Sequence, residues 1–207
     1  MLRILGRQHS INVRKVLWTA DELGLDYQHE PWGNEGFPLS SPTFITLNPN
    51  ALVPVLVDGD FVIYESNAIC RYLADKYPSA GLLPKEAHGR ALVDQWMDWQ
   101  LSELNESWRY AFMALVRQSA HHTDASLIQT SITAWNRNMA ILDKALTKSM
   151  RFLVADQLTL ADIVIGLSTH RWYSTPIERP ELIHVRRFYE GLCSRPAFAK
   201  YANNGQP

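Results

Sequence analysis

The stretch from residue 48 to residue 69 constrains the fold of this chain more than any other. Two short apolar runs, residues 55–57 and residues 61–64, flank Asp58-Gly59-Asp60. Because Asp-Gly readily adopts the positive φ angles of a tight turn, this pattern predicts a hairpin of two antiparallel strands. The second strand runs directly into Glu65-Ser66 and then into apolar residues at helical spacing, so a helix is expected to begin there.

Ser66 is predicted to be the N-cap of this helix, with Glu65 beside the positive end of the helix dipole. Pro54 stands directly before the first strand of the hairpin, where a missing backbone N–H is tolerated. The helix start therefore offers a carboxylate, a hydroxyl and backbone N–H groups that lack a partner within the helix. If the two strands lie side by side, Pro54 and the helix start line the same pocket.

The elements around the hairpin predict a mixed sheet. In chain order we expect a strand at residues 2–5, a helix at 13–23, a strand at 27–31, a mobile loop at 32–42, a helical turn at 44–47, the hairpin and a helix at 67–76. The first β-α-β unit predicts two parallel strands with a right-handed crossover, and the hairpin adds two antiparallel strands. The expected fold is an α/β domain with a mixed four-stranded sheet and helices on its faces.

The second part of the chain is predicted to be an all-helical bundle. Residues 78–84 contain Pro and Gly and indicate a linker between a first domain, 1–77, and a second domain, 85–207. Thr159 and Asp162 form a capping box before an apolar run, so we expect a structural role for Asp162 and a central position for the helix that follows. The other helices are expected at residues 90–117, 126–148, 182–192 and 196–201.

Composition narrows the class of protein. The 207 residues carry a formal net charge of −1, which argues against a nucleic-acid surface built on bulk positive charge. Neither a leader sequence nor a long uncharged apolar run is present, so we expect a soluble, cytoplasmic protein with no membrane partner. The isolated Cys70 and Cys193 predict buried packing, and His121-His122 lacks companions at metal-ligand spacing, so no metal is expected.

Three motifs, in their order and spacing, resemble those of the cytosolic glutathione S-transferases over essentially the whole chain. They are Asn48-Pro49 with Val53-Pro54, residues 64–69 with Tyr72-Leu73, and residues 158–162. Residues 7–18 look like the bacterial serine-type branch of that family, near the theta and nu classes. The resemblance implies a thioredoxin-like first domain, a helical second domain, glutathione as co-substrate and a homodimer.

The resemblance also implies roles for individual residues. The peptide bond before Pro54 is expected to be cis, and the backbone of Val53 is expected to pair with the cysteinyl part of glutathione like an added strand. Glu65 and Ser66 are expected to hold the γ-glutamyl end of glutathione. The hydroxyl of Ser10 is expected to face the sulfur.

A catalyst of this kind must stabilise a thiolate, because a free thiol has a pKa of about 8.5. Ser10 can donate one hydrogen bond to the sulfur, and the amides at the start of the first helix add their dipoles. Asn12 offers a second donor through its side-chain amide. We expect Ser10 to be the main donor and Asn12 to assist, but the sequence does not decide between them. An ordinary helix cap is the alternative role for Ser10.

This sequence departs from the family pattern just before the Val-Pro pair. Many relatives carry Gly-Lys, His or Gln there, whereas Ala51 and Leu52 offer glutathione only backbone atoms. The glycyl carboxylate of glutathione therefore needs another partner. The sequence leaves open Arg7, His9, Asn50 and a residue of the loop at 32–37.

Candidates for a second-substrate pocket lie on the first long helix of the second domain and on the helix after Thr159. They are Trp108, Arg109, Phe112, Met113, Arg171 and Trp172. Aromatic residues at helical spacing belong to the core more often than to a site, which is the alternative role for these side chains. An apolar pocket with an arginine at its rim would suit a small electrophile that carries an acidic group.

The predicted function is transfer of glutathione to a small electrophile by substitution or addition. Dehalogenation, isomerisation and peroxide reduction use the same thiolate and are alternative activities. A non-catalytic binding or stress-response module is a further alternative, because fold does not determine function. The presence of Ser10, Pro54, Glu65 and Ser66 together favours the enzyme, while the absence of Lys or Gln near Leu52 counts slightly against it.

Overall fold

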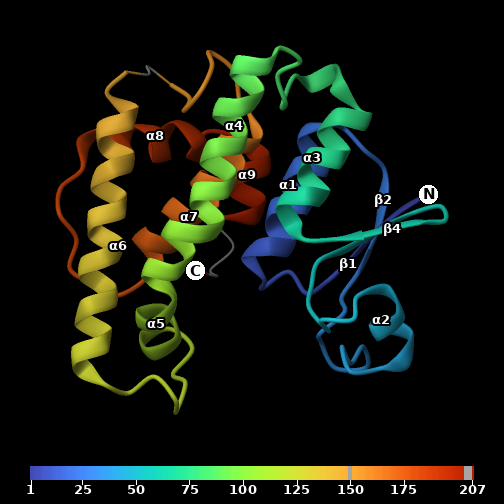
Figure 1. Cartoon of the computed structure of the whole chain (residues 1–207), viewed down its shortest axis with the longest axis horizontal. Helices are drawn as coiled ribbons and strands as arrows, with labels where there is room; N and C mark the ends of the chain where they lie inside the picture. Colours follow the sequence, from blue (N-terminus) through green and yellow to red (C-terminus); the bar gives the residue numbers. More distant parts are fainter. Residues whose placement is uncertain (149–150, 203–206) are drawn as a thin grey trace. The chain divides into compact units, whose positions relative to one another are not determined.

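The computed structural model of this chain describes residues 1–148, 151–202 and 207, so residues 149–150 and 203–206 of the predicted second domain lie outside the described residues. The chain divides into two compact units, Met1–Leu83 and Pro84–Pro207, each of which is described by itself. Figure 1 shows strands in the first unit, and the described residues of the second unit form helices and connecting loops.

The first unit contains the predicted mixed four-stranded sheet. Its strands lie in the order β2-β1-β3-β4, with β1 parallel to β2 and antiparallel to β3, and with β3 antiparallel to β4. The elements are β1 (Leu2–Leu5), α1 (Ile11–Glu22), β2 (Tyr27–Glu30), α2 (Pro42–Leu47), β3 (Val55–Asp58), β4 (Phe61–Tyr64), α3 (Ser66–Lys76) and a short 3₁₀ helix (Pro78–Ala80).

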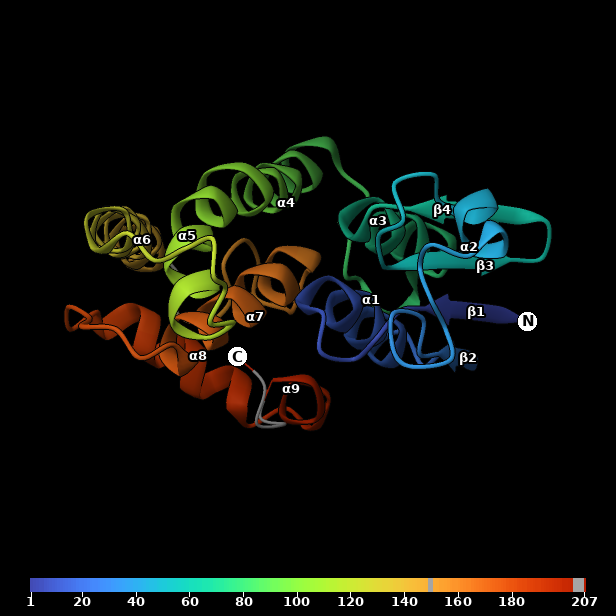
Figure 2. The same cartoon turned by 90° about the horizontal axis from the view of Figure 1, so that it is seen from below.

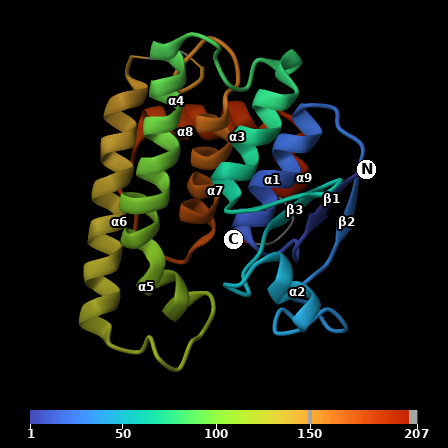
Figure 3. The ribbon, with the colours of Figure 1, turned by 45° about the vertical axis from the view of Figure 1, so that its right-hand side comes forward.

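The two faces of the sheet are covered by different elements. Leu5, Val55 and Val57 project from one face and pack with Phe44 of α2 in a buried cluster. Because side chains alternate along a strand, Ile4 and Leu56 project from the other face, where both are fully buried. α1 and α3 cover that second face, as Figure 3 shows.

α1 and α3 run side by side in the same direction. The Lys15 ammonium approaches the Asn67 side-chain oxygen at 3.5 Å, and the Thr19 hydroxyl donates to the Cys70 sulfur at 3.3 Å. Lys15 precedes Thr19 on α1 just as Asn67 precedes Cys70 on α3, so the two helices are parallel. Their N-termini therefore lie at the same end of the pair.

The start of α3 differs from the sequence expectation. Ser66 is the first residue of the helix, and Glu65 is the N-cap, with a φ of 73°. The chain leaves β4 through this positive-φ residue, and the Glu65 carbonyl accepts the first helical hydrogen bond from Ile69 at 2.9 Å. Prediction of Ser66 as the cap was wrong because the turn out of the strand is one residue shorter than the side-chain pattern indicated.

The described residues of the second unit form helices joined by loops and include no strand, as predicted. It contains α4 (Ala87–Trp99), a π-helical turn η2 (Gln100–Leu104), α5 (Asn105–Leu115), α6 (Ala125–Leu146), α7 (Leu160–Ser174), α8 (Ile183–Cys193) and α9 (Pro196–Tyr201). The single long helix expected at residues 90–117 is therefore interrupted by η2. The buried Gln100 side chain donates to Asn105 in the next turn and to Ser168 on α7, and the spacing of apolar residues reveals neither bond.

α7 is the central helix of the second unit, as the apolar sequence predicted. Residues 160–172 are all buried, and α7 packs against α4 and α8 (Figure 2). The fully buried Asp162 accepts hydrogen bonds from the backbone N–H and the hydroxyl of Thr159, both at 2.8 Å, and from the Leu153 N–H at 2.7 Å. Its expected structural role in the capping box is confirmed.

Two further predictions have different outcomes. Cys70 is fully buried, as expected, whereas Cys193 near the end of α8 is exposed. Burial of Cys193 was wrong because it lies on the solvent side of an amphipathic helix whose buried residues are Val185, Phe188 and Leu192. No helix among residues 1–148 and 151–202 has both the length and the apolar character needed to cross a membrane.

Candidate active site

The ends of all strands in the sheet converge at one edge. Leu5, the last residue of β1, pairs with Glu30, the last residue of β2, and with Val55, the first residue of β3. Val55 in turn pairs with Tyr64, the last residue of β4. The segments that leave or enter the sheet at these residues therefore meet at this edge, hereafter the site edge.

Gly6 lets two of these segments approach closely. It follows β1 with a φ of +150°, and a Cβ at this position would overlap the Val13 side chain of α1 and lie 2.9 Å from the Val53 Cβ. A side chain at residue 6 would therefore push apart the loop that leads to Ser10 and the turn that contains Val53. A contact from β2 also holds Gly6 in place, because His29 Nε2 lies 2.7 Å from the Gly6 carbonyl oxygen.

Ser10 stands at the N-terminus of α1 at this edge. Its backbone is extended, with φ −79° and ψ 121°, and its carbonyl accepts from the Arg14 N–H at 3.0 Å. The Ser10 hydroxyl makes no capping hydrogen bond, which counts against the ordinary-cap alternative. Asn12 is the second residue of α1, and both side chains are partly exposed. The first turn carries no acidic side chain, so none competes with an anion there.

The Val53–Pro54 peptide bond is cis, as the resemblance implied. Asn48 shapes the turn before it: the buried side chain donates to the Leu52 carbonyl at 2.8 Å and accepts from the Asn50 backbone N–H at 3.1 Å. Leu52 is 61% exposed, and its side chain points away from the core. The backbone around Val53 is thus held in a fixed turn by Asn48, which the sequence pattern indicated only as part of a motif.

Glu65 and Ser66 lie at the same edge but in different environments. Ser66 is buried, with 5% of its surface exposed, whereas the Glu65 side chain is exposed. Glu65 occupies a turn with positive φ, and its exposed carboxylate is open to solvent at the strand ends. The first turn of α3, like that of α1, carries no acidic side chain. Two helix N-termini of the same electrostatic sign therefore face the site edge.

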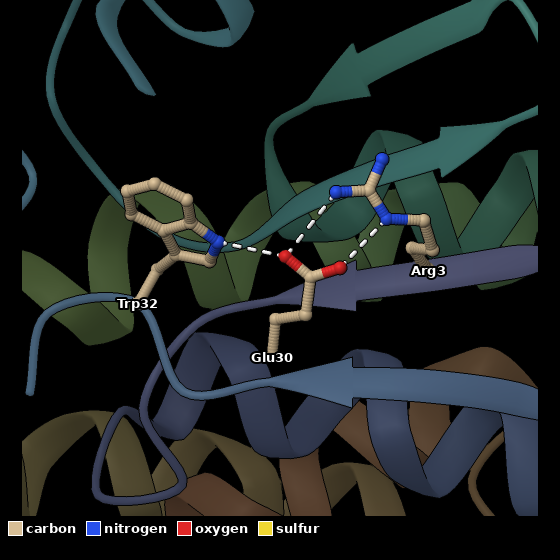
Figure 4. A network of polar contacts seen from close by, with 3 residues as sticks. All are labelled: Arg3, Glu30 and Trp32. Atoms are coloured by element: carbon tan, nitrogen blue, oxygen red, sulfur yellow. Dashed lines mark hydrogen bonds and ion pairs between the residues drawn. The ribbon is translucent and has the colours of Figure 1, made fainter. Parts of the chain in front are cut away.

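A charged network anchors the loop that leaves the sheet at Glu30. Arg3 Nε donates to one Glu30 carboxylate oxygen at 2.6 Å, and Arg3 Nη2 and Trp32 Nε1 donate to the other at 3.2 Å and 2.9 Å (Figure 4). The hydrogen bond from Arg3 lowers the pKa of the Glu30 carboxyl. The Trp32 ring packs on Phe37 and Phe44, so the irregular loop at residues 32–41 is attached to the sheet at its start.

The residues considered as partners of the glycyl carboxylate of glutathione fall into two groups. Arg7 is exposed and its Nη1 donates to the Gly33 carbonyl at 3.2 Å, which places the guanidinium between the β1–α1 loop and the Trp32 loop. His9 is also exposed. The Asn50 amide, in contrast, donates to the Asn48 side chain at 3.1 Å and is used in shaping the turn.

The structure brings together only some of the residues predicted to contact the second substrate. The Arg171 guanidinium lies over the rings of Trp108 and Phe112, 4.5 Å and 4.2 Å from their centroids. Asn105 orients Trp108 by accepting from its Nε1 at 3.1 Å. Phe112 and Arg171 are each 3% exposed, so this cluster is also part of the core of the second unit.

The other three candidates have different surroundings. Trp172 is buried and its Nε1 donates to Asn136 of α6 at 2.9 Å. Arg109 is exposed and lies 3.8 Å from the Glu106 carboxylate, and Met113 is partly exposed. Within the residues that the structure describes, no group of three or more His, Cys, Asp or Glu side chains is arranged to hold a metal ion.

Comparison with known proteins decides the family. Residues 9–76 match the family described as glutathione S-transferase, N-terminal domain, and residues 107–196 match glutathione S-transferase, C-terminal domain. Glutathione S-transferase GstB of Escherichia coli K12 is 34% identical over 202 residues, which cover 97% of each chain. The chain belongs to the glutathione S-transferase family.

Other members of the glutathione S-transferase family match over similar lengths. Glutathione S-transferase 3 of Zea mays is 31% identical, and the match covers 96% of this chain and 92% of that protein. The crystal structure of the theta class glutathione S-transferase from Xanthomonas axonopodis pv. citri with glutathione bound has a TM-score of 0.89 and 38% identity, covering 97% of this chain and 96% of that one. The expected thioredoxin-like and helical parts are those of the family.

Several residues that shape the site of this glutathione S-transferase were missed or undervalued from sequence. Gly6 carries a signal that could have been used, since a glycine directly after a strand often marks a close approach of backbone. The Asn-Pro-Asn run likewise indicates a side-chain-stabilised turn. Lys15 and Asn67 gave no such signal, because only the packing of α1 on α3 buries them.

Proposed function

We propose that this protein is a glutathione transferase that binds glutathione along the site edge and transfers it to a small electrophile. The observation that carries the proposal is the convergence of Ser10, the cis Val53–Pro54 turn and Glu65-Ser66 at the ends of paired strands. Family membership supports it, since the related Xanthomonas structure was solved with glutathione bound.

The backbone of Val53 is proposed to pair with the cysteinyl part of glutathione, as an added strand would. Leu52 adds backbone atoms only, and Pro54 sets the direction of the turn. The start of α3, with Glu65 and Ser66, is proposed to hold the γ-glutamyl end: the carboxylate of Glu65 suits its ammonium group, and the Ser66 amide and hydroxyl suit its carboxylate.

The thiol is then proposed to lie at the start of α1. The Ser10 hydroxyl donates a hydrogen bond to the sulfur, Asn12 provides a second donor, and the amides of the first turn favour a negative charge. The proton leaves to solvent or to the carboxylate of the peptide. The thiolate sulfur forms a bond to an electrophilic carbon, and either a leaving group departs with its electron pair or the adduct takes up a proton.

Substitution of Ser10 tests this mechanism. Ser10→Ala is expected to lower kcat with a chloronitroaromatic electrophile by about a hundredfold, in the range found when one donor to a developing anion is removed. Glutathione affinity, followed by the fluorescence of the tryptophans, is expected to change much less. Asn12→Ala is the matched variant: if Ser10→Ala is fully active and Asn12→Ala is not, Asn12 is the main donor.

The electrophile is proposed to contact the cluster of Trp108, Phe112 and Arg171, with Arg109, Met113 and Trp172 as further candidates. An aromatic surface beside a guanidinium favours an aromatic electrophile with an acidic substituent. Dehalogenation, isomerisation and peroxide reduction remain alternatives that use the same thiolate. If the wild-type protein shows neither glutathione binding nor thiolate absorbance, the result would instead support a non-catalytic module.

Assembly and location complete the proposal. We propose a homodimer in the cytoplasm, because both are typical of the family. Light scattering after size-exclusion chromatography checks the first point, with a mass twice the 23.7 kDa of the chain expected. Fractionation of the source cells checks the second.

A further inference from the structure

The contact between Lys15 and Asn67 lies near the starts of α1 and α3, the two helix starts that the proposed glutathione site uses. Lys15 belongs to α1 and is fully buried, and Asn67 belongs to α3 and is 4% exposed. The Lys15 ammonium is 3.5 Å from the Asn67 side-chain oxygen. A buried ammonium is costly unless polar groups surround it, so its place in the fold requires partners in well-defined positions.

This contact joins the two helices at the ends that carry the site. Lys15 follows Asn12 by three residues and therefore lies on the same face of α1. Asn67 follows Ser66 directly and lies in the first turn of α3. The helix that presents the thiolate donors is thus linked, within about one and a half turns of its start, to the helix that holds the γ-glutamyl end.

We propose that Lys15 is a positioning residue of the glutathione site: acting through Asn67, it fixes the starts of α1 and α3 relative to each other, so that Ser10 and Ser66 hold one glutathione molecule at the correct spacing. The proposal rests on the proposed glutathione site. Its chemical reason is that glutathione must reach both helix starts at once, and misplacement of about 1 Å costs on the order of a hundredfold in rate.

The same helix pair offers a contact with a different role. One turn further along, the Thr19 hydroxyl donates to the Lys15 carbonyl at 2.8 Å and to Cys70 at 3.3 Å. Burial raises the pKa of Cys70 to about 11, so its thiol is neutral at physiological pH. This second contact stabilises α1 against α3 but lies farther from the helix starts, which makes Thr19→Val a matched control.

Three variants test the proposal: Lys15→Met keeps most of the side-chain length, Asn67→Ala keeps the ammonium, and Thr19→Val breaks the control contact. Two measurements are made on each. The first is hydrogen exchange of the Ile69 amide in the ligand-free protein, because its bond to the Glu65 carbonyl closes the first turn of α3. The second is the pKa of the bound glutathione thiol, from thiolate absorbance across pH.

Lys15→Met and Asn67→Ala are expected to speed exchange at Ile69 by about tenfold, to raise the pKa of the bound thiol and to lower kcat/KM by about ten- to a hundredfold. Thr19→Val is expected to lower the melting temperature without these effects. A general structural role would change stability alone, since the bound thiol in the folded fraction would keep its pKa, and that result overturns the proposal. If Lys15→Met fails to fold, Asn67→Ala decides.

The test separates this proposal from the proposed function. If the wild-type protein binds no glutathione, the proposed function is ruled out. Exchange at Ile69 in the ligand-free variants still shows whether Lys15 fixes the start of α3. Conversely, if Lys15→Met and Asn67→Ala both bind glutathione normally and show unchanged exchange at Ile69, the proposed role of Lys15 is ruled out. That result would leave the proposed function standing.

Discussion

At the scale of single residues, the candidate site depends on small side chains and unusual backbone angles more than on reactive groups. Gly6 at φ +150° and Glu65 at φ 73° occupy conformations that most residues avoid. Each stands where the chain leaves a strand at the site edge. These angles bring the Ser10 loop, the Val53 turn and the start of α3 close together.

Gly6→Ala is predicted to damage the site more than it damages the fold elsewhere. The added Cβ meets Val13 and Val53 and also imposes a disfavoured φ, which together cost about 2–4 kcal/mol. Glutathione affinity, measured by calorimetry, should fall by at least tenfold. Gly24→Ala is the control: it has a φ of +65° but no atom within 4 Å of the added Cβ, so it should lower stability only.

At the scale of elements, the helix starts determine both the site and the stability of the second unit. α1 and α3 leave their first turns without acidic side chains, which keeps the helix N-termini open to an anionic ligand. In contrast, the first turn of α7 contains an acidic residue, Asp162. Its buried carboxylate accepts hydrogen bonds from nearby backbone N–H groups.

The capping carboxylate predicts a pH dependence of stability. Burial raises the pKa of Asp162 to about 6, while bonds from Leu153 and Thr159 act in the opposite direction. A folded-state pKa above the unfolded value of about 3.9 means that this group favours the folded state most below pH ~4. Its contribution is lost as pH rises through about 6, by about 2–3 kcal/mol.

The measurement is the difference in unfolding free energy between wild type and Asp162→Asn, by urea denaturation at several pH values. The difference should shrink as pH rises from 4 to 6. A difference that grows over this interval would mean that the hydrogen bonds outweigh burial and that the folded-state pKa is depressed. Asp162→Ala, which removes all three bonds, should be less stable than Asp162→Asn at every pH.

At the scale of the whole molecule, ligand binding and folding are linked. The proposed glutathione site lies at an edge formed by every strand of the sheet, so unfolding of the first unit would release the ligand. At a concentration a hundred times its Kd, a ligand of this kind stabilises the folded state by about 2.7 kcal/mol. For a chain of 207 residues, this corresponds to an increase in melting temperature of about 5–10 °C.

Scanning calorimetry with and without glutathione checks this prediction. The increase should appear in the transition that includes the first unit, and S-methylglutathione should produce it as well, because the thiolate is not needed for backbone pairing at Val53. A peptide unrelated to glutathione provides the control. Equal melting temperatures with and without glutathione would contradict binding at the site edge.

The sequence predicted local structure well and long-range placement less well. The hairpin around Gly59, the parallel β1–β2 pair and the capping box at Thr159 all follow from short patterns and are present. The π-helical turn at residues 100–104 was missed, and its buried Gln100 bonds to Ser168 on another helix, a contact that local spacing does not encode. Cys193 was placed in the core because spacing alone did not identify its face of α8.

The sequence by itself determined the strands, the helices, the tight turn and the family, since each depends on neighbouring residues and on recognisable motifs. Only the tertiary structure decided how these parts meet. It made Glu65 the N-cap, buried Ser66 and Lys15, and placed the ends of β1, β3 and β4 in register. The physical reason is that strand register and helix packing arise from contacts between residues far apart in the chain, which local patterns do not encode.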